Sequence, residues 1–419
     1  MKKLMVILLA LVIAVSSASF ALAEEQTTIT LWHRWSGTNE EILNQCVAQF
    51  EEQNPGIKFE ITAKAGEYFE LLQSMIADAA AGNEKPDIFV GGYNLLNYIA
   101  SELQPTNVDE LAPSQEELDA LYANYTPEML ALSNVGGEQI GLPLAVSNMV
   151  MYVNMDIFEE AGLTEEDIPT TWEEVMTVCE TIKNNTDHYG MYVQLPDNWG
   201  DQGLIFSAGG EMLNEDKTRV NFTNEGCIKA IQMWQDLYTN GYAPVCTDAE
   251  AMANFSAGDI AMQCTTIMKI NTFGEYVTYD LKIAECPGFE GQTKQLPAGG
   301  AAMISFATDD AKKAAVFEFM KYMSSQEGME TFTKTGYLCV TTAEVPMVDG
   351  QEAAYAQTQY ARPWECWPGG SIGLEIDARW LTVRNAILME GADVVESLTA
   401  LEEECNMMQI GRASCRERV

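Results

Sequence analysis

The amino-acid sequence predicts an α/β protein of two domains, each a mainly parallel sheet wrapped by helices. From Thr28 to about Ile99, short apolar segments alternate with amphipathic segments in the order strand, helix, strand, helix, strand, which is typical of a parallel sheet covered on both faces. The 419 residues exceed what one ordinary core holds, so two domains are expected. No internal repeat or low-complexity linker separates them, which predicts that the chain crosses between the domains more than once.

The first helix shows how these elements are recognised. Thr38 and Glu41 form a capping box that starts it, and Ile42, Cys46 and Phe50 then recur on one helix face. Strands are expected at residues 29–31, 57–62 and 87–90. After an irregular acidic stretch at 104–138, further strands are expected at 140–144, 149–153, 190–193, 260–263 and 302–307. The later helices are expected at 172–182, 225–240, 309–324, 378–389 and 394–404.

The N-terminus has the three parts of a secretory signal peptide. Lys2 and Lys3 precede an apolar run at 4–15, and Ala21-Leu22-Ala23 offers a cleavage site before Glu24. The run is shorter than the ~20 residues that a membrane-spanning helix needs. We therefore expect residues 1–23 to be removed and the protein to be periplasmic, secreted or at the cell surface. No Cys stands at the cleavage point to carry a lipid anchor.

Charge and composition narrow the partners. The formal net charge of −39 repels nucleic acid and anionic lipid, which argues against both as partners. The chain has two His and no Cys-x-x-Cys pair, so no metal site or other cofactor is expected. Residues 411–419 hold three of the 23 basic residues and are expected to be a cloning or sequencing scar.

Several short motifs follow one another in a fixed order along residues 28–345. They are Phe50–Ile57 (F-x-x-x-N-P-G-I), Ala81–Ile88 (A-G-x-x-x-P-D-I), Tyr152–Leu163 (Y-x-N-x-D-x-F-x-x-A-G-L), Pro169–Glu174 (P-x-T-W-x-E) and Phe255–Met262 (F-x-x-G-x-x-A-M). In this order they resemble the bacterial extracellular solute-binding proteins of the family-1, maltose-binding type. Two positions depart from the pattern: Val153 stands where a second Tyr is common, and Cys339 where Pro is common.

The resemblance implies a two-lobed periplasmic-binding-protein fold of type II, in which a multi-strand hinge joins two α/β lobes. The first lobe is expected to comprise residues 24–143 and 288–338, and the second 144–287 and 339–410. The lobes would close on a ligand by hinge motion and present it to the permease subunits of an ABC importer in the membrane. The protein is expected to be a monomer. It is not expected to be an enzyme, because other subunits of the importer hydrolyse the ATP.

A carbohydrate, either a monosaccharide or an oligosaccharide, is the expected ligand. A sugar cleft needs aromatic platforms and a few convergent polar groups, and in open α/β sheets it lies beyond the carboxyl ends of strands. Trp199 stands out because a Trp among polar and Gly residues in a loop has little core to join, although core packing stays the alternative for Trp35, Trp364 and Trp367. The full set of candidates is His33, Trp35, Tyr68, Tyr93, Asn94, Ser147, Asn148, Trp199, Asp201, Gly300, Tyr337, Arg362, Trp364 and Trp367.

Other ligands and one other class of function stay open. The same fold could bind a glycerol phosphate, a sugar phosphate or a polyamine. Phosphate requires Arg or Lys in the cleft, for which the candidates are Arg34, Arg362, Arg379 and Arg384, and the acidity of the chain favours a polyamine over a phosphate. A secreted glycoside hydrolase needs only two suitably placed carboxylates, which the spacing of the acidic residues does not exclude.

Overall fold

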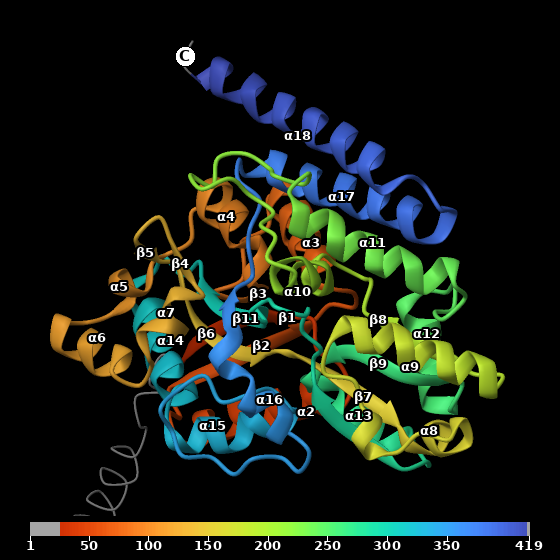
Figure 1. Cartoon of the computed structure of the whole chain (residues 1–419). Coiled ribbons are helices and arrows are strands. Elements are labelled where there is room, and N and C mark those ends of the chain that lie inside the picture. Colours follow the sequence, from red (N-terminus) through yellow and green to blue (C-terminus); the bar gives the residue numbers. More distant parts are fainter. Residues whose placement is uncertain (1–25, 417–419) are drawn as a thin grey trace, which may run out of the picture.

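The computed structural model describes residues 26–416 and, at the C-terminal end, side chains as far as Gln409 (Figure 1). The expected signal peptide at 1–23 lies outside the described residues, as do the last three residues of the tail 411–419. The backbone of 411–416 continues the final helix. Within the described residues, no helix is both long enough and apolar enough to cross a bilayer.

A six-stranded sheet forms the centre of the first lobe in the described residues. Its strands run in the order β12-β11-β3-β1-β2, with β6 also paired to β11. They are β1 (Thr27–His33), β2 (Ile57–Ala63), β3 (Ile88–Gly92), β6 (Gly141–Ser147), β11 (Leu296–Ser305) and β12 (Ala361–Pro363). The helices of this lobe are α2 (Thr38–Gln53), α3 (Tyr68–Ala80), α4 (Leu96–Tyr98), α5 (Val108–Leu111), α6 (Gln115–Tyr122), α7 (Pro127–Ala131), α14 (Asp310–Met323) and α15 (Gln326–Phe332).

A four-stranded sheet forms the centre of the second lobe, in the order β10-β7-β9-β8. Its strands are β7 (Met149–Asn154), β8 (Tyr189–Val193), β9 (Ile260–Thr266) and β10 (Leu281–Glu285). The helices α8 (Met155–Ala161), α9 (Trp172–Asn185), α12 (Asp248–Ala257), α13 (Ile270–Tyr276) and α16 (Glu352–Ala356) lie around it. A further group, which extends from α10 in the middle of Figure 1 to α18 at its top, consists of α10 (Trp199–Ser207), α11 (Glu225–Thr239), α17 (Ser371–Glu390) and α18 (Val394–Arg416).

The chain crosses between the two sheets with very short connections. β6 belongs to the first sheet and β7 to the second, and only Asn148 separates them. The chain returns between β10 and β11, and the backbone of Leu338 then pairs with Val146 on β6, with an N–H to O distance of 2.8 Å. Several strands therefore pass side by side through the junction of the lobes. The exact division of residues between the lobes stays a prediction.

These crossings explain where the sheets contain antiparallel pairs. β1, β2 and β3 pair in parallel, as the alternation of strands and helices predicts. β11 runs antiparallel to β3 and β6, and β7 runs antiparallel to β9 and β10. Both strands enter their sheet directly from the other lobe, without the helical crossover that a parallel neighbour requires.

The start of α2 and one longer segment differ from their sequence-based expectations. Helix α2 begins at Thr38, after Gly37, and the capping box expected from Thr38 and Glu41 does not form. Residues 104–138, expected to be irregular, contain α5, α6 and α7 together with the two-residue strands β4 (Asn134–Val135) and β5 (Glu138–Gln139). The hydroxyls of Ser114 and Thr126 accept hydrogen bonds from the backbone at the starts of α6 and α7, which are typical N-caps. The helices are too short for a clear apolar repeat, so only their caps mark them.

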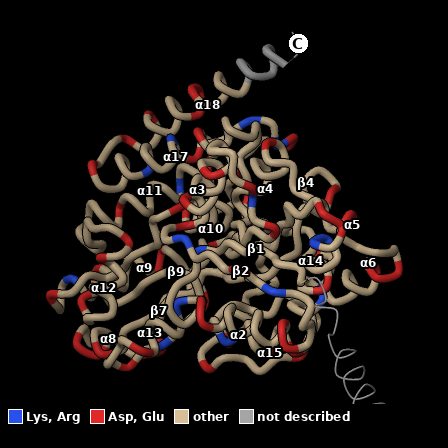
Figure 2. Tube along the Cα trace, turned by 180° about the vertical axis from the view of Figure 1, so that it is seen from behind, with Lys and Arg blue, Asp and Glu red and all other residues tan. Residues whose placement is uncertain are grey.

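The cysteines of the described chain are free, and the acidic residues are spread over the outside of both lobes (Figure 2). Cys46 and Cys179 are fully buried, as small core residues are, and the nine cysteines of the described chain form no disulfide bond. Acidic residues are spread over the outer helices and loops of both lobes, whereas basic residues are sparse (Figure 2). The acidity is thus a property of the whole surface.

The packing of α10 against α11 depends on a pair of glycines. A Cβ atom placed on Gly226, near the start of α11, would lie 2.2 Å from the backbone nitrogen of Gly210. No side chain can move away to relieve this contact, because the obstructing atoms are backbone. Gly226 therefore sets how closely the two helices approach, and α10 carries part of the site described below.

We expect Gly226→Ala to lower the free energy of unfolding by roughly 2 kcal/mol or more, as overpacking of a dense core does. Urea unfolding followed by circular dichroism measures this loss. The matched control is Gly274→Ala, since Gly274 lies in helix α13 with no atom within 4 Å of an added Cβ. Equal stability of the two variants would contradict the proposed contact.

A candidate ligand-binding site between the lobes

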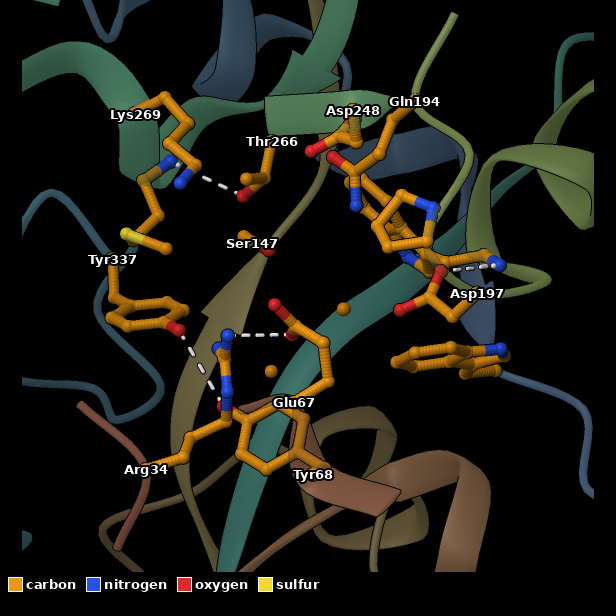
Figure 3. A pocket seen from close by; sticks show the side chains of 16 residues that line it. Arg34, Glu67, Tyr68, Ser147, Gln194, Asp197, Asp248, Thr266, Lys269 and Tyr337 are labelled. Atoms are coloured by element: carbon orange, nitrogen blue, oxygen red, sulfur yellow. Dashed lines mark hydrogen bonds and ion pairs between the residues drawn. The ribbon is translucent and has the colours of Figure 1, made fainter. Parts of the chain in front are cut away.

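A cavity of about 530 Å³, partly open to solvent, lies where the two lobes meet (Figure 3). Both lobes contribute to its walls. The lining residues are Arg34, Glu67, Tyr68, Ser147, Gln194, Pro196, Asp197, Trp199, Asp248, Thr266, Met268, Lys269, Gly299, Gly300, Tyr337 and Trp364.

The wall of the first lobe combines a charged pair with two phenol rings. Arg34, just beyond the end of β1, forms an ion pair of 2.5 Å with Glu67, and its guanidinium lies 4.9 Å from the centre of the Tyr68 ring. Burial raises the pKa of Tyr68 well above its ordinary value, so its hydroxyl stays neutral. That hydroxyl lies 3.5 Å from the hydroxyl of Tyr337, which accepts a hydrogen bond of 3.1 Å from the indole of Trp35.

Two tryptophans form much of the opposite wall. Trp199 is the first residue of α10, where the chain leaves β8, and its indole N–H donates to the carbonyl of Pro297 at 2.8 Å. Trp364 follows β12, and its ring centre lies 6.5 Å from that of Trp199, with the ring planes inclined by 56°. Gly299 permits this arrangement, because an added Cβ would lie 2.8 Å from the Trp199 indole.

Acidic and basic groups of the second lobe complete the cavity. Burial raises the pKa of Asp197 to about 8, although the backbone N–H of Trp199 lowers it. Burial also raises the pKa of Asp248, while the nearby Lys269 lowers it. The Oδ1 atom of Asp248 is buried and has no hydrogen-bond partner in the protein. The cavity therefore offers aromatic surface, carboxyl oxygens and two cationic side chains, Arg34 and Lys269, to a bound molecule.

Comparison with known protein families shows to which family the chain belongs. Residues 45–358 match the family described as bacterial extracellular solute-binding proteins. The protein belongs to that family.

Individual proteins also match this chain over most of its length, one by sequence and two by structure. The sn-glycerol-3-phosphate-binding periplasmic protein UgpB of Escherichia coli K12 is 24% identical over 344 residues, which are 79% of this chain and 78% of the relative. The cyclic α-maltosyl-1,6-maltose-binding protein of Arthrobacter globiformis superposes with a TM-score of 0.76 at 21% identity, over 92% and 99% of the two chains. UgpB of Mycobacterium tuberculosis, solved with glycerophosphocholine, gives 0.80 at 19% identity, over 93% and 99%. The solute-binding protein thus has the two-lobed type II fold.

Six of the sequence-based candidates line the cavity of this solute-binding protein. They are Tyr68, Ser147, Trp199, Gly300, Tyr337 and Trp364. Trp35 lies directly behind them and holds the hydroxyl of Tyr337. Asn94 and Trp367 line neighbouring cavities instead. The structure therefore brings aromatic residues from four distant parts of the chain to one place, and their contact with a ligand stays a prediction.

Three candidates of the first lobe and the hinge are buried behind the cavity instead. His33 is fully buried, its Nδ1 accepts from the backbone N–H of Trp35, and burial lowers its pKa to about 4, so the ring is neutral. The hydroxyl of Tyr93 donates to the carbonyl of Ala145. The amide of Asn148 donates to the carbonyl of Ala354. The bonds of Tyr93 and Asn148 join segments that are far apart in the sequence, whereas the bond of His33 is local.

Asp201 and Arg362 also lie outside the cavity. Asp201 was expected to be in a loop, but it is on helix α10, whose residues are all buried. Its carboxylate forms an ion pair of 2.9 Å with Arg384 and accepts from the indole of Trp380. Arg362 pairs with Glu211 at 2.9 Å. Both charges are thus compensated by partners within the protein.

The sequence contained a usable signal for several lining residues that were not among the candidates. Thr266 is the last residue of β9 and Lys269 follows it closely, at the strand end where the cleft is expected. Glu67 and Asp197 lie beside Tyr68 and Trp199, which were selected. Asp248 is at the start of α12, before a strand instead of after it, and no local pattern pointed to it.

We expect the stability of the protein to report on the buried carboxyl of Asp197. Because its pKa is raised from 3.8 to about 8 in the folded protein, the folded state holds the proton more tightly than the unfolded chain. Its contribution to stability is therefore complete below about pH 4 and is lost as the pH rises through about 8. Asp197→Asn removes this dependence and keeps an oxygen for the N–H of Trp199.

Thermal unfolding of the wild type and of Asp197→Asn, at about pH 5 and about pH 8.5, measures the effect. The melting temperature of the variant relative to wild type should rise between the two pH values. Glu166→Gln, at an exposed position of the second lobe, serves as the control. Parallel profiles for wild type and Asp197→Asn would show that the carboxyl titrates normally.

Proposed function

We propose that this solute-binding protein captures a carbohydrate between its lobes and delivers it to the permease subunits of an ABC importer. The observation that carries the proposal is that the indoles of Trp199 and Trp364, whose ring centres lie 6.5 Å apart, line one cavity together with the Tyr68 ring. Sugar rings present weakly apolar C–H faces that pack on such aromatic surfaces. Their hydroxyls can donate to the carboxyl groups of Asp197 and Asp248 at the edges of the rings.

The proposed action is binding without catalysis. A glycoside hydrolase needs one carboxylic acid and one carboxylate flanking the bond that is cleaved. The cavity holds three acidic side chains, and two of them are engaged within the protein: Glu67 pairs with Arg34 at 2.5 Å, and Asp197 accepts from the backbone N–H of Trp199. The membership of the chain in a binding-protein family supports the same conclusion. Incubation with the bound oligosaccharide, followed by an assay for reducing ends, should show no release.

We propose that the protein acts outside the cytoplasmic membrane as a monomer, exported by the segment 1–23. The extracellular character of the family supports this location. The acidic surface of both lobes (Figure 2) supports a protein that stays dispersed in solution.

A glycerol phosphate is the second candidate ligand, and one observation favours it. Arg34 and Lys269 both line the cavity, and cationic side chains are what phosphate recognition requires. The name of the E. coli relative states that it binds glycerol 3-phosphate. Against a phosphate ligand, the charge of Arg34 is already neutralised by Glu67. The positive charge of Lys269 would then have to compensate the negative charges of both Asp248 and the phosphate.

We expect Trp364→Ala and Trp199→Ala each to weaken the binding of an oligosaccharide at least about tenfold, equivalent to roughly 1.4 kcal/mol. The loss arises because each substitution removes a stacking surface from the cavity wall. Isothermal titration calorimetry with a panel of neutral oligosaccharides measures it. Trp32→Phe is the matched control, since Trp32 lies on β1 outside the cavity, beneath Lys64. Undiminished affinity in both alanine variants would refute stacking in this cleft.

Lys269→Gln separates the two candidate ligands. We expect wild type to bind a neutral oligosaccharide more tightly than glycerol 3-phosphate or a polyamine. The substitution should weaken binding of the phosphate ester about tenfold or more, because it removes a charge-assisted hydrogen bond, and should change oligosaccharide affinity by less than about threefold. Lys313→Gln, on α14 away from the cavity, is the control. Tightest binding of glycerol 3-phosphate by wild type would reverse the order of the candidates.

A further inference from the structure

Trp364 lines two neighbouring chambers. The first is the cavity described above, and the second, of about 600 Å³, is lined by residues of α3, α17 and the loop before α10. Tyr68, Asp197 and Trp364 line both chambers. The angle of the Trp364 ring therefore affects the shape of both at once.

The indole of Trp364 is held by a chain of hydrogen bonds. Its N–H donates to Oδ1 of Asn198 at 2.7 Å. The Nδ2 of Asn198 in turn donates to Oδ1 of Asp377 on α17 at 2.5 Å. The same carboxylate oxygen accepts from the indole N–H of Trp367 at 2.7 Å. Three segments, namely the loop before α10, the loop after β12 and α17, are thereby joined through one asparagine.

A second set of bonds fixes the backbone next to Trp364. The side chain of Gln202, one turn along α10, donates to the carbonyl of Glu365 at 3.0 Å and accepts from its N–H at 2.9 Å. The same Nε2 of Gln202 lies 3.3 Å from Oδ1 of Asn198. Both the main chain and the ring of the Trp364 loop are thus attached to α10.

The pattern of donors and acceptors allows only one orientation of the Asn198 amide. Its oxygen faces two donors, the Trp364 indole and the Gln202 amide, and its nitrogen faces the Asp377 carboxylate. A rotated amide would place N–H groups against N–H groups and oxygen against a carboxylate. Asn198 is only 1% exposed, so water cannot replace the lost bonds, and leaving such groups unpaired is costly.

From this network we infer that Asn198, oriented by Asp377, is a positioning residue that sets the angle of the Trp364 ring and thereby the affinity for ligand. The inference rests on the proposed function, in which Trp364 is a stacking surface. Asn198 acts through Trp364, because it does not line the first chamber and its side-chain oxygen and nitrogen are both occupied within the protein. Its contribution to binding is therefore indirect, and a substitution that preserves the bonding pattern should preserve binding.

The first experiment exchanges the two polar groups. Asn198→Asp places an oxygen where Asp377 needs a donor, and Asp377→Asn weakens the acceptor for Trp367; each should lower oligosaccharide affinity about fivefold or more. Because the Trp367 indole donates to the same Asp377 oxygen as Asn198 does, the exchange is made in a Trp367→Phe background, where no second donor faces that position. There the double variant Asn198→Asp/Asp377→Asn restores a donor facing an acceptor and still accepts from Trp364, and we expect its affinity to return to within about threefold of the Trp367→Phe parent. A double variant as weak as the sum of the single changes would overturn the inference.

The second experiment asks whether Asn198 acts through the Trp364 ring. Trp364→Phe keeps an aromatic ring but removes the N–H that Asn198 holds. Asn198→Ala should weaken binding about fivefold or more in the wild-type background but less than about twofold in the Trp364→Phe background. Melting temperatures establish that each variant is folded, and the difference in fluorescence between each protein with Trp364 and its Trp364→Phe counterpart isolates the emission of this indole among the eight tryptophans. Equal losses in the two backgrounds would show that Asn198 serves only general stability.

The two proposals fail in different ways. If wild type binds none of the neutral oligosaccharides, phosphate esters and polyamines tested, the proposed function is wrong and the positioning role falls with it. If wild type binds a ligand that Trp364→Ala weakens, while every Asn198 variant binds as wild type does, only the positioning role is wrong.

Discussion

The close approach of β11 to β6 is the constraint on which the rest of the cleft depends. Gly300 has a φ of +118°, and an added Cβ would lie 2.0 Å from the carbonyl oxygen of Ala145, so only glycine fits. Beside it, Gly299 leaves room for the indole of Trp199. The N–H of that indole donates to the carbonyl of Pro297, which precedes Gly299 on the same strand. β11 also pairs with β12, from which the chain leads to Trp364. One strand with almost no side chain at this point therefore positions both tryptophans.

The charges of the cleft differ from those of the surface. Outside, the carboxylates are solvated and need no partner. Inside, Glu67 is paired with Arg34, and the pKa of Asp197 is raised to about 8 by burial, so each acid is either compensated or partly protonated. This is what desolvation demands of ionisable groups enclosed by two lobes. The net charge of the chain is consequently a poor guide to the chemistry of its ligand site.

The sequence predicted much of the fold because the fold is built from local patterns. Alternating strands and helices, capping boxes and the motif order were sufficient for the two-lobed architecture. They also pointed to Trp199 and Trp364, because a Trp surrounded by Gly, Pro and polar residues is unusual. The ion pair of Asp201 could not be predicted from the sequence, because its partner Arg384 lies 183 residues away and no periodicity links them. Sequence reasoning treated Asp201 as a loop residue, whereas the structure places it inside a buried helix.

The hydrogen-bonding state of the cleft narrows the kind of molecule that fits it. The indole N–H groups of Trp35, Trp199 and Trp364 all donate to protein acceptors, so these rings offer a ligand only their carbon surfaces. In the described part of the chain, the buried side-chain atoms that line the chambers without a partner are oxygens, on Asp248 and Asn94. Such a site calls for donors on the ligand. Sugar hydroxyls donate, whereas an ionised phosphate only accepts, and a polyol between aromatic faces therefore satisfies the cleft better than a phosphate group would.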